Sequence, residues 1–490
     1  MRHDWNRRSF LKSAAALAAL SLCPQVPAAG TSANLFPVPR QKAPARIRGA
    51  FFYPPAEVVL AGRCEDSWSK HQWFTWPGNQ FKPEEQQGRF MERVQGLCQG
   101  LDLALILDAA PLYTDAAIEA FIADIQQSKP DALLLFNFWN SFSAKLNPIL
   151  DAYEGPIILY HPLGASHQLP PARFRTEKRL QYIHSIEHWD ALERGLRAVH
   201  GMTRMRQSRL LRVSGRLDAE ADDREPFFDM PVHGVPTEHF NDIFDGIEAD
   251  ATLKNIAGMI RAAATQVSDL SDGAFIDAVR AHAAVVAIMD RHEADAITID
   301  CLFLKHRKPC LSFSMNNGAL VPCGCENDLN ATLTLMLGAN LFGRGGFQHN
   351  PEYDTEENLY FASHCTCATR LHGPGQEPAP YALRPFFHQL PKTVAFDVQW
   401  PAGEPVTLCK FHSNRPPETP LLDAWAGELV SSPASPPTGG CATRALVRLN
   451  GVDDVCSTYP GPHPVLFCGD FAKQLKTFAQ LYDLRIRSNA

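Results

Sequence analysis

Short apolar runs alternate with segments of helical spacing along the first half of the chain. Five apolar runs have the length and composition of buried strands: residues 47–52, 103–107, 132–136, 156–160 and 209–213. Three segments between them carry apolar residues at helical spacing: 84–98, 115–128 and 187–205. Strands joined by helical crossovers predict a parallel sheet with helices on both faces, a Rossmann-like α/β organisation. No G-x-G-x-x-G follows the first strand, which argues against a bound dinucleotide.

The second half mixes the two patterns. Helical spacing recurs at 249–267, 272–292, 327–340 and 469–482, and a buried strand is predicted at 295–304. Residues 380–448 have the pattern of short strands separated by prolines. We therefore predict an α/β protein with two Rossmann-like parallel-sheet units and a C-terminal α/β unit that carries a β-rich region. The predicted boundaries are 1–29 for a signal peptide, 30–46 for a linker, then 47–215, 216–310 and 311–490.

The N-terminus has the pattern of a bacterial export signal. A paired arginine in Asn6-Arg7-Arg8-Ser9-Phe10-Leu11-Lys12 precedes an uncharged run and then small residues near Ala28. This order is typical of a twin-arginine signal, which exports folded proteins. The apolar run is shorter than the roughly 20 residues that span a bilayer. We expect a periplasmic or extracellular protein with no membrane span after cleavage; an uncleaved anchor and lipidation at Cys23 are the alternatives.

Composition excludes some partners. The formal net charge of the 490 residues is −7, which argues against nucleic acid as a partner. Of 13 cysteines, several lie in apolar runs, as Cys301 does, where a thiol behaves as a small buried hydrophobe. The pairs Cys323-Gly324-Cys325 and Cys365-Thr366-Cys367 leave a disulfide or a thiolate metal site open, beside the simpler interpretation of buried thiols.

Metal-ligand residue types recur at four places in the C-terminal half. They are Glu326, His349, His364 and His463. A carboxylate with two or three imidazoles is a normal ligand set for a divalent transition metal. Spacing alone does not show that they converge, and a single histidine is more often structural. Asp328 precedes a predicted helix, where a carboxylate suits the N-cap position.

Several segments together resemble the L-fucose/L-arabinose isomerase superfamily, and its poorly characterised isomerase-like branch more than the sugar isomerases proper. They are 294–302, 308–311, 321–329, 350–354, 362–365 and 461–470. The resemblance covers 47–485 loosely and 294–372 most specifically. It implies an aldose–ketose interconversion through an enediol at a Mn²⁺-type site, and a homo-oligomer whose subunits complete each other's sites.

The resemblance assigns roles by position. It makes Glu326 a metal ligand and acid/base, and it makes His364 and His463 metal ligands. The second carboxylate of the family falls near residues 347–350, where His349 and Asn350 stand instead. We therefore take His349 as the candidate for that ligand and proton-transfer role. Two acids a few residues on, Glu352 and Asp354, are alternatives, although solvated loop charges explain them better.

Four residues of the N-terminal half are candidates for binding a small-molecule carbohydrate. Trp73 and Trp76 lie in an aromatic loop after the first strand, where their faces could stack on sugar rings. Aromatic packing between domains is the alternative. Asn137 and His161 follow predicted parallel strands, at the edge where doubly wound sheets bind ligands.

The sequence thus predicts an exported, metal-dependent enzyme that interconverts an aldose and a ketose. Two alternatives stay open. The missing second carboxylate favours a non-catalytic periplasmic carbohydrate-binding protein. An epimerase, lyase or hydrolase on the same scaffold would need one base only.

Overall fold

A computed structural model describes residues 35–64, 82–138, 140–163, 170–386, 393–413, 419–434 and 438–489. The predicted signal peptide, Trp73 and Trp76 lie outside the described residues. The chain divides into two compact units, and each is described by itself. One comprises residues 43–203 and 476–484, and the other comprises 1–42, 204–475 and 485–490.

The unit of residues 43–203 is built on a five-stranded parallel sheet in the order β2-β1-β3-β4-β5. Its strands are β1 (Ala45–Phe52), β2 (Leu103–Leu107), β3 (Ala132–Asn137), β4 (Ile157–Pro162) and β5 (Leu180–Ser185). β3 is buried along its whole length, as a strand covered on both faces should be. The predicted parallel α/β organisation is confirmed for this unit, with β5 as a strand that the sequence pattern did not show.

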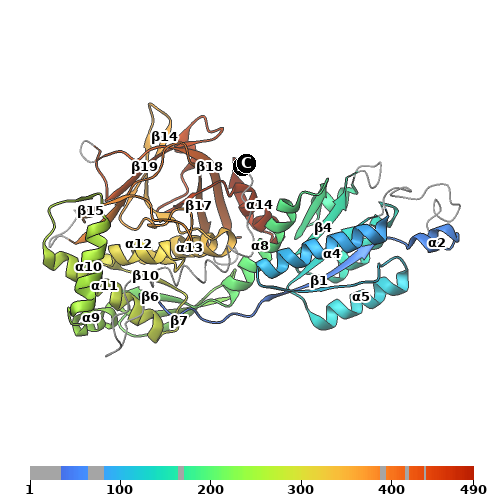
Figure 1. Cartoon of the computed structure of the whole chain (residues 1–490), viewed down its shortest axis with the longest axis horizontal. Coiled ribbons are helices and arrows are strands. Elements are labelled where there is room, and N and C mark those ends of the chain that lie inside the picture. The colour runs from blue at the N-terminus through green and yellow to red at the C-terminus, as the bar shows by residue number, and fades with distance from the viewer. Residues whose placement is uncertain are drawn as a thin grey trace. The chain divides into compact units, whose positions relative to one another are not determined.

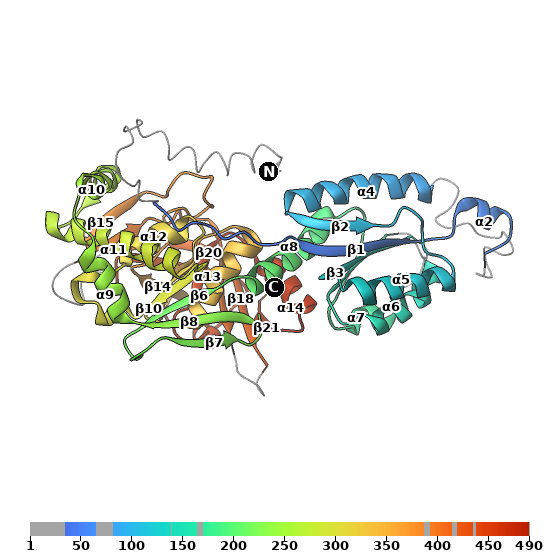
Figure 2. The ribbon, with the colours of Figure 1, turned by 90° about the horizontal axis from the view of Figure 1, so that it is seen from below.

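Helices cover both faces of this sheet, with α4 on one side and α5 to α7 on the other (Figure 2). The helices are α2 (Ala56–Leu60), α4 (Pro83–Gly100), α5 (Asp115–Ser128), α6 (Asn147–Ala152), α7 (Ala172–Thr176) and α8 (Trp189–Arg206), with a 3₁₀ turn at Asn140–Leu146. α5 begins at a side-chain cap, because Thr114 accepts a hydrogen bond from the backbone N–H of Ala117. Apolar residues of α5 then pack in the core with β3 and β4.

The other unit contains a mostly parallel sheet in the order β11-β10-β6-β8-β7, with β7 antiparallel at its edge. Its strands are β6 (Leu210–Ser214), β7 (Ala221–Glu225), β8 (Met230–Pro236), β10 (Ala296–Ile299) and β11 (Cys323–Cys325). The helices that follow these strands are α9 (Thr237–Gly246), α10 (Ala251–Ala263), α11 (Asp272–Arg291), α12 (Cys310–Gly318) and α13 (Leu329–Phe342), with 3₁₀ turns at Cys301–Phe303 and Lys305–Arg307.

An eight-stranded sheet forms the rest of this unit. Its strands are β12 (Phe347–Gln348), β13 (Asn350–Asp354), β14 (Leu359–His364), β17 (Pro405–His412), β18 (Leu421–Ser431), β19 (Thr443–Leu449), β20 (Val465–Cys468) and β21 (Arg485–Ser488). A small sheet joins β9 (Gln266–Val267), β15 (Tyr381–Pro385) and β16 (Val394–Val398). The last elements are a 3₁₀ turn at Val455–Thr458 and α14 (Ala472–Leu481). α13 contacts β10 and β11 of one sheet and β17 and β20 of the other, so it lies between them (Figure 1).

The units divide differently from the predicted domains. The sheet around β10 takes strands from all three predicted regions, since β6 precedes residue 216 and β11 follows residue 310. A boundary inside a hydrogen-bonded sheet cannot separate compact domains. Residues 35–42 of the predicted linker also contact this unit, where Lys42 pairs with Asp295. The chain is therefore mixed α/β with one fully parallel sheet, one mostly parallel sheet and a β-rich C-terminal region.

Candidate metal centre

Glu326 stands at the carboxyl end of β11, at the edge where sheets of this kind bind ligands. β11 approaches α13 closely at Gly324, where a Cβ atom would lie 1.9 Å from Thr332 Oγ1. Glu326 and Asn327 then both adopt left-handed backbone conformations, each with a φ of 57°. Such conformations cost roughly 1 kcal/mol or more for residues with a side chain, and they cluster at functional sites.

Hydrogen bonds from neighbouring strands hold this turn. The backbone N–H of Asn327 donates to the carbonyl of Ile299 at 3.1 Å. The Asn327 side chain accepts from Arg212 Nε at 2.7 Å and donates to Ser214 Oγ at 3.1 Å. The ends of β6 and β10 thus fix the direction in which Glu326 points.

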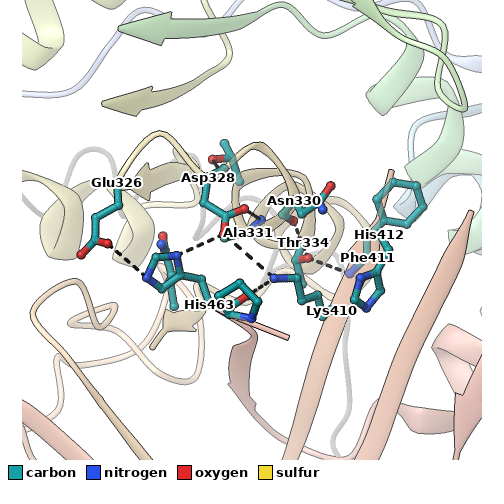
Figure 3. Close-up of polar contacts among 12 residues, drawn as sticks. Glu326, Asp328, Asn330, Ala331, Thr334, Lys410, Phe411, His412 and His463 are labelled. Carbon is teal, nitrogen blue, oxygen red and sulfur yellow. Dashed lines mark hydrogen bonds and ion pairs between the residues drawn. The ribbon is translucent and has the colours of Figure 1, made fainter. Parts of the chain in front are cut away.

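Two histidines converge on Glu326. His364 ends β14, and its Nε2 lies 3.5 Å from Glu326 Oε1. His463 precedes β20, and its Nε2 lies 3.5 Å from Glu326 Oε2 (Figure 3). The two imidazole rings are perpendicular, with centroids 5.5 Å apart. Three of the four residues that the sequence singled out as ligands therefore meet in one place.

These separations fit a shared metal ion better than hydrogen bonds. A nitrogen–oxygen hydrogen bond is normally 2.7–3.2 Å long, shorter than either contact. Two donor atoms that each lie about 2.1 Å from one zinc-type ion are roughly 3.4 Å apart at a tetrahedral angle. Glu326 is 30% exposed at its side chain, whereas the side chain of His364 is 2% exposed, so the group opens to solvent on the carboxylate side.

Each histidine has a partner for its other ring nitrogen. His463 Nδ1 lies 3.1 Å from Asp328 Oδ2 (Figure 3), and His364 Nδ1 lies 3.3 Å from Thr366 Oγ1. A partner at Nδ1 orients the ring and leaves Nε2 available, as is usual for metal-binding histidines. The predicted N-cap is confirmed too, because Asp328 Oδ1 accepts from the backbone N–H of Ala331 at 2.9 Å.

A buried lysine completes the charge pattern around Asp328. Lys410 on β17 donates from Nζ to the carbonyl of Pro462 and lies 4.0 Å from Asp328 Oδ2 (Figure 3). Burial lowers the pKa of Lys410, although Asp328 and Asp423 partly oppose this. Burial would raise the pKa of Asp328, but His463 and Lys410 outweigh it and hold the pKa below its usual value.

The charges at the centre shift the pKa values of His364 and Cys325. Burial lowers the pKa of His364, but its contact with Glu326 and the nearby Cys325 outweigh burial and raise that pKa to about 9. Contacts with Cys301 and Cys365 lower the pKa of the Cys325 thiol against the effect of its burial. Atoms of Cys325, Glu326 and His364 that can bind a metal all lie within 4.8 Å of one another.

Sequence reasoning missed Asp300, a second carboxyl group near Glu326. It follows β10 directly, is 6% exposed, and accepts a hydrogen bond from the backbone of Gly215. Burial raises its pKa, and the charge of Glu326 adds to this effect. Asp300 lies inside the strand predicted at 295–304, and an acid within that apolar run was the available signal.

His349 does not join the group at Glu326 in this structure. Its Nδ1 lies 2.8 Å from the carbonyl of Phe347, and its Nε2 lies 2.7 Å from the Tyr360 hydroxyl. Burial lowers its pKa to about 3, so the ring is neutral, and both of its nitrogens have partners. The neighbouring Gln348 bonds both backbone polar groups of Cys325, at 2.7 and 3.1 Å.

The remaining predicted residues lie elsewhere. Glu352 and Asp354 are exposed on β13, and Asp354 accepts backbone hydrogen bonds within its turn. Asn137 and His161 are buried at the carboxyl ends of β3 and β4, in the unit of residues 43–203. His161 Nδ1 contacts the Tyr182 hydroxyl at 3.3 Å, and burial lowers the pKa of this histidine to about 3.

Comparisons with known proteins give no family for this chain. No family model matches it, and no curated protein matches it. Within the described residues, no helix combines the length and apolar character needed to cross a membrane.

Proposed function

We propose that this protein is a metal-dependent enzyme that interconverts an aldose and a ketose at Glu326, His364 and His463. One observation carries the proposal: each oxygen of Glu326 faces one imidazole Nε2 at 3.5 Å, while each Nδ1 has its own partner. Carboxylate and imidazole donors suit a divalent transition metal. Export by the twin-arginine route, a carbohydrate as the small-molecule partner and a homo-oligomeric state remain predictions.

The donor set fits the chemistry that the proposal needs. A divalent ion held here would act as a Lewis acid on the carbonyl and hydroxyl oxygens of a sugar. Glu326 is the exposed edge of the group, so a substrate approaches from its side. Asp328 keeps His463 oriented, and the turn bonds of Asn327 keep Glu326 in place.

Asp300 is the group that we propose for proton transfer. It supplies the second carboxyl group that an enediol route requires, since one acid or base must move the proton between C1 and C2. Its raised pKa makes it readier to hold a proton than an exposed aspartate is. An acid of this kind can donate a proton and take one back.

Gln348 favours one alternative, a carbohydrate-binding protein without turnover. It is one of residues 347–350, near which the resembled family has its second carboxylate, and its amide bonds both backbone polar groups of Cys325. An amide in that role neither carries charge nor moves protons. In this alternative the metal centre binds a sugar, and Asp300 has no chemical task.

Metal content and turnover, measured on matched variants, test the proposal. We expect the full-length chain to bind about one equivalent of a divalent transition metal and to interconvert at least one aldose and its ketose. Glu326→Gln should lose both, whereas Glu352→Gln, at an exposed glutamate of β13, should lose neither. Metal and sugar binding without turnover would favour the binding protein, and a chain that takes up no metal would refute both.

A further inference from the structure

Five buried cysteines lie beside the centre. Cys325 Sγ is 3.1 Å from Cys301 Sγ, and Cys365 Sγ is 3.4 Å from Cys310 Sγ. Cys365 and Cys441 pack in one buried cluster with Cys310. The cluster adjoins the metal-ligand candidates in sequence as well as in space, because Cys325 precedes Glu326 and Cys365 follows His364.

We propose that the Cys325 sulfur is a ligand of the metal ion, and that the ion is therefore of the zinc class and not Mn²⁺. The inference rests on the proposed metal centre and goes beyond it by naming the donor that selects the metal. The sulfur lies within 4.8 Å of a carboxylate oxygen of Glu326 and a ring nitrogen of His364. His463, whose Nε2 lies 3.5 Å from Glu326 Oε2, would supply a fourth donor beside the sulfur, the oxygen and the first nitrogen.

The geometry of such a set matches a tetrahedral ion. Zinc binds sulfur at about 2.3 Å and imidazole nitrogen at about 2.1 Å, which places the two donors roughly 3.6 Å apart. The three donors lie within 4.8 Å of one another, and binding an ion would draw them to this separation. When the bond to sulfur forms, the Cys325 S–H bond breaks and its proton passes to solvent.

A second thiol contacts this sulfur. The Cys301 thiol, 3.1 Å away, can donate its S–H to Cys325 and so acts as a partner behind the ligand.

Ligand chemistry then decides between metals. Thiolate is a soft donor that selects zinc and similar ions, whereas carboxylate, carbonyl and water oxygens suit manganese. A centre with one thiolate, one carboxylate and two imidazoles therefore favours zinc over manganese. Cobalt(II) binds the same donors with tetrahedral geometry, and its absorption spectrum shows whether a sulfur is among them.

Cobalt(II) titration of the full-length chain, kept reduced with a phosphine, tests the inference. We expect one equivalent of Co²⁺ to produce a near-ultraviolet sulfur-to-cobalt charge-transfer band. Cys325→Ser should lose this band and bind Co²⁺ roughly tenfold or more weakly. The control is Cys409→Ser, at a buried cysteine of β17 whose neighbour Lys410 faces the centre; it should keep the band.

Each outcome has a distinct meaning. Stoichiometric Co²⁺ without the band, or a band that persists in Cys325→Ser, would refute the thiolate ligand and leave the metal centre standing. No Co²⁺ uptake by the unmodified chain would refute the metal centre itself. Far-ultraviolet circular dichroism of each variant shows whether a lost band reflects a lost fold.

Discussion

Replacing Asp328 with asparagine separates two roles of one side chain. Oδ1 caps α13 by accepting from the Ala331 N–H at 2.9 Å, and Oδ2 accepts from His463 Nδ1 at 3.1 Å. Asparagine caps helices about as well as aspartate, so its carbonyl oxygen can keep the cap. Its neutral amide, however, no longer holds the imidazole with a charge. We therefore expect Asp328→Asn to keep the cap, and any loss in the free energy of unfolding to come from His463 and the buried Lys410, which lose a charged partner.

Metal affinity should fall as well, because Asp328 orients His463. Removing a carboxylate behind a ligating histidine typically weakens metal binding 10- to 100-fold, or about 1.4–2.7 kcal/mol. Zinc competition titration measures this loss, and urea unfolding measures stability. The matched control is Asp354→Asn, because Asp354 also accepts backbone hydrogen bonds but is exposed on β13. An unchanged dissociation constant in Asp328→Asn, with the fold intact, would refute the orienting role.

Three further predictions concern stability. Burial lowers the pKa of His282 to about 4, so an unfolded chain protonates this group first as pH falls. The free energy of unfolding should therefore drop by about 3 kcal/mol between pH 6.5 and pH 4. A urea midpoint that falls as steeply with pH in His282→Gln as in the parent chain would contradict this prediction. Gly324→Ala should destabilise by roughly 1–3 kcal/mol in urea unfolding, since its Cβ would meet Thr332, whereas Gly96→Ala, in open space on a helix, should not. In Gln348→Glu the side chain can donate to the buried Cys325 carbonyl only while its carboxyl group is protonated. Its urea midpoint should therefore fall further below that of the parent chain as pH rises above about 4.3.

Local patterns predicted the elements well. The strand at 103–107 and the helix at 115–128 have the bounds that the apolar spacing indicated, because both depend on residues close in sequence. The pattern gave no sign of α12 (Cys310–Gly318), whose residues are buried nearly all round. A helix without a polar face shows little periodicity, so its sequence resembles a buried strand.

Sheet membership was less predictable than the elements. The apolar run at 209–213 was assigned to the N-terminal sheet, yet β6 pairs with β8 and β10 instead. A buried parallel strand has the same composition in either sheet, and the choice between partners depends on long-range packing. The predicted boundaries at 215/216 and 310/311 depended on that choice.

The site shows the same division between local and long-range information. Glu326, His364 and His463 were named from residue type and from a family resemblance, and their convergence required the fold. His349 has the right side chain, but Tyr360 and the Phe347 carbonyl occupy its nitrogens. Strand pairing decides whether a side chain joins the centre or is held by other hydrogen-bond partners. The identity of a single residue does not reveal this.

The placement of the proposed metal centre would couple metal binding to the packing of one unit. The mostly parallel sheet supplies Glu326 at the end of β11, and the eight-stranded sheet supplies His364 and His463. α13 links the two, because Asp328 at its start contacts His463, and Thr334 accepts from the Phe411 N–H of β17 at 2.9 Å (Figure 3). An ion bound by donors from both sheets stabilises only the state in which the sheets are packed together. The same packing holds the donors in place, so each stabilises the other.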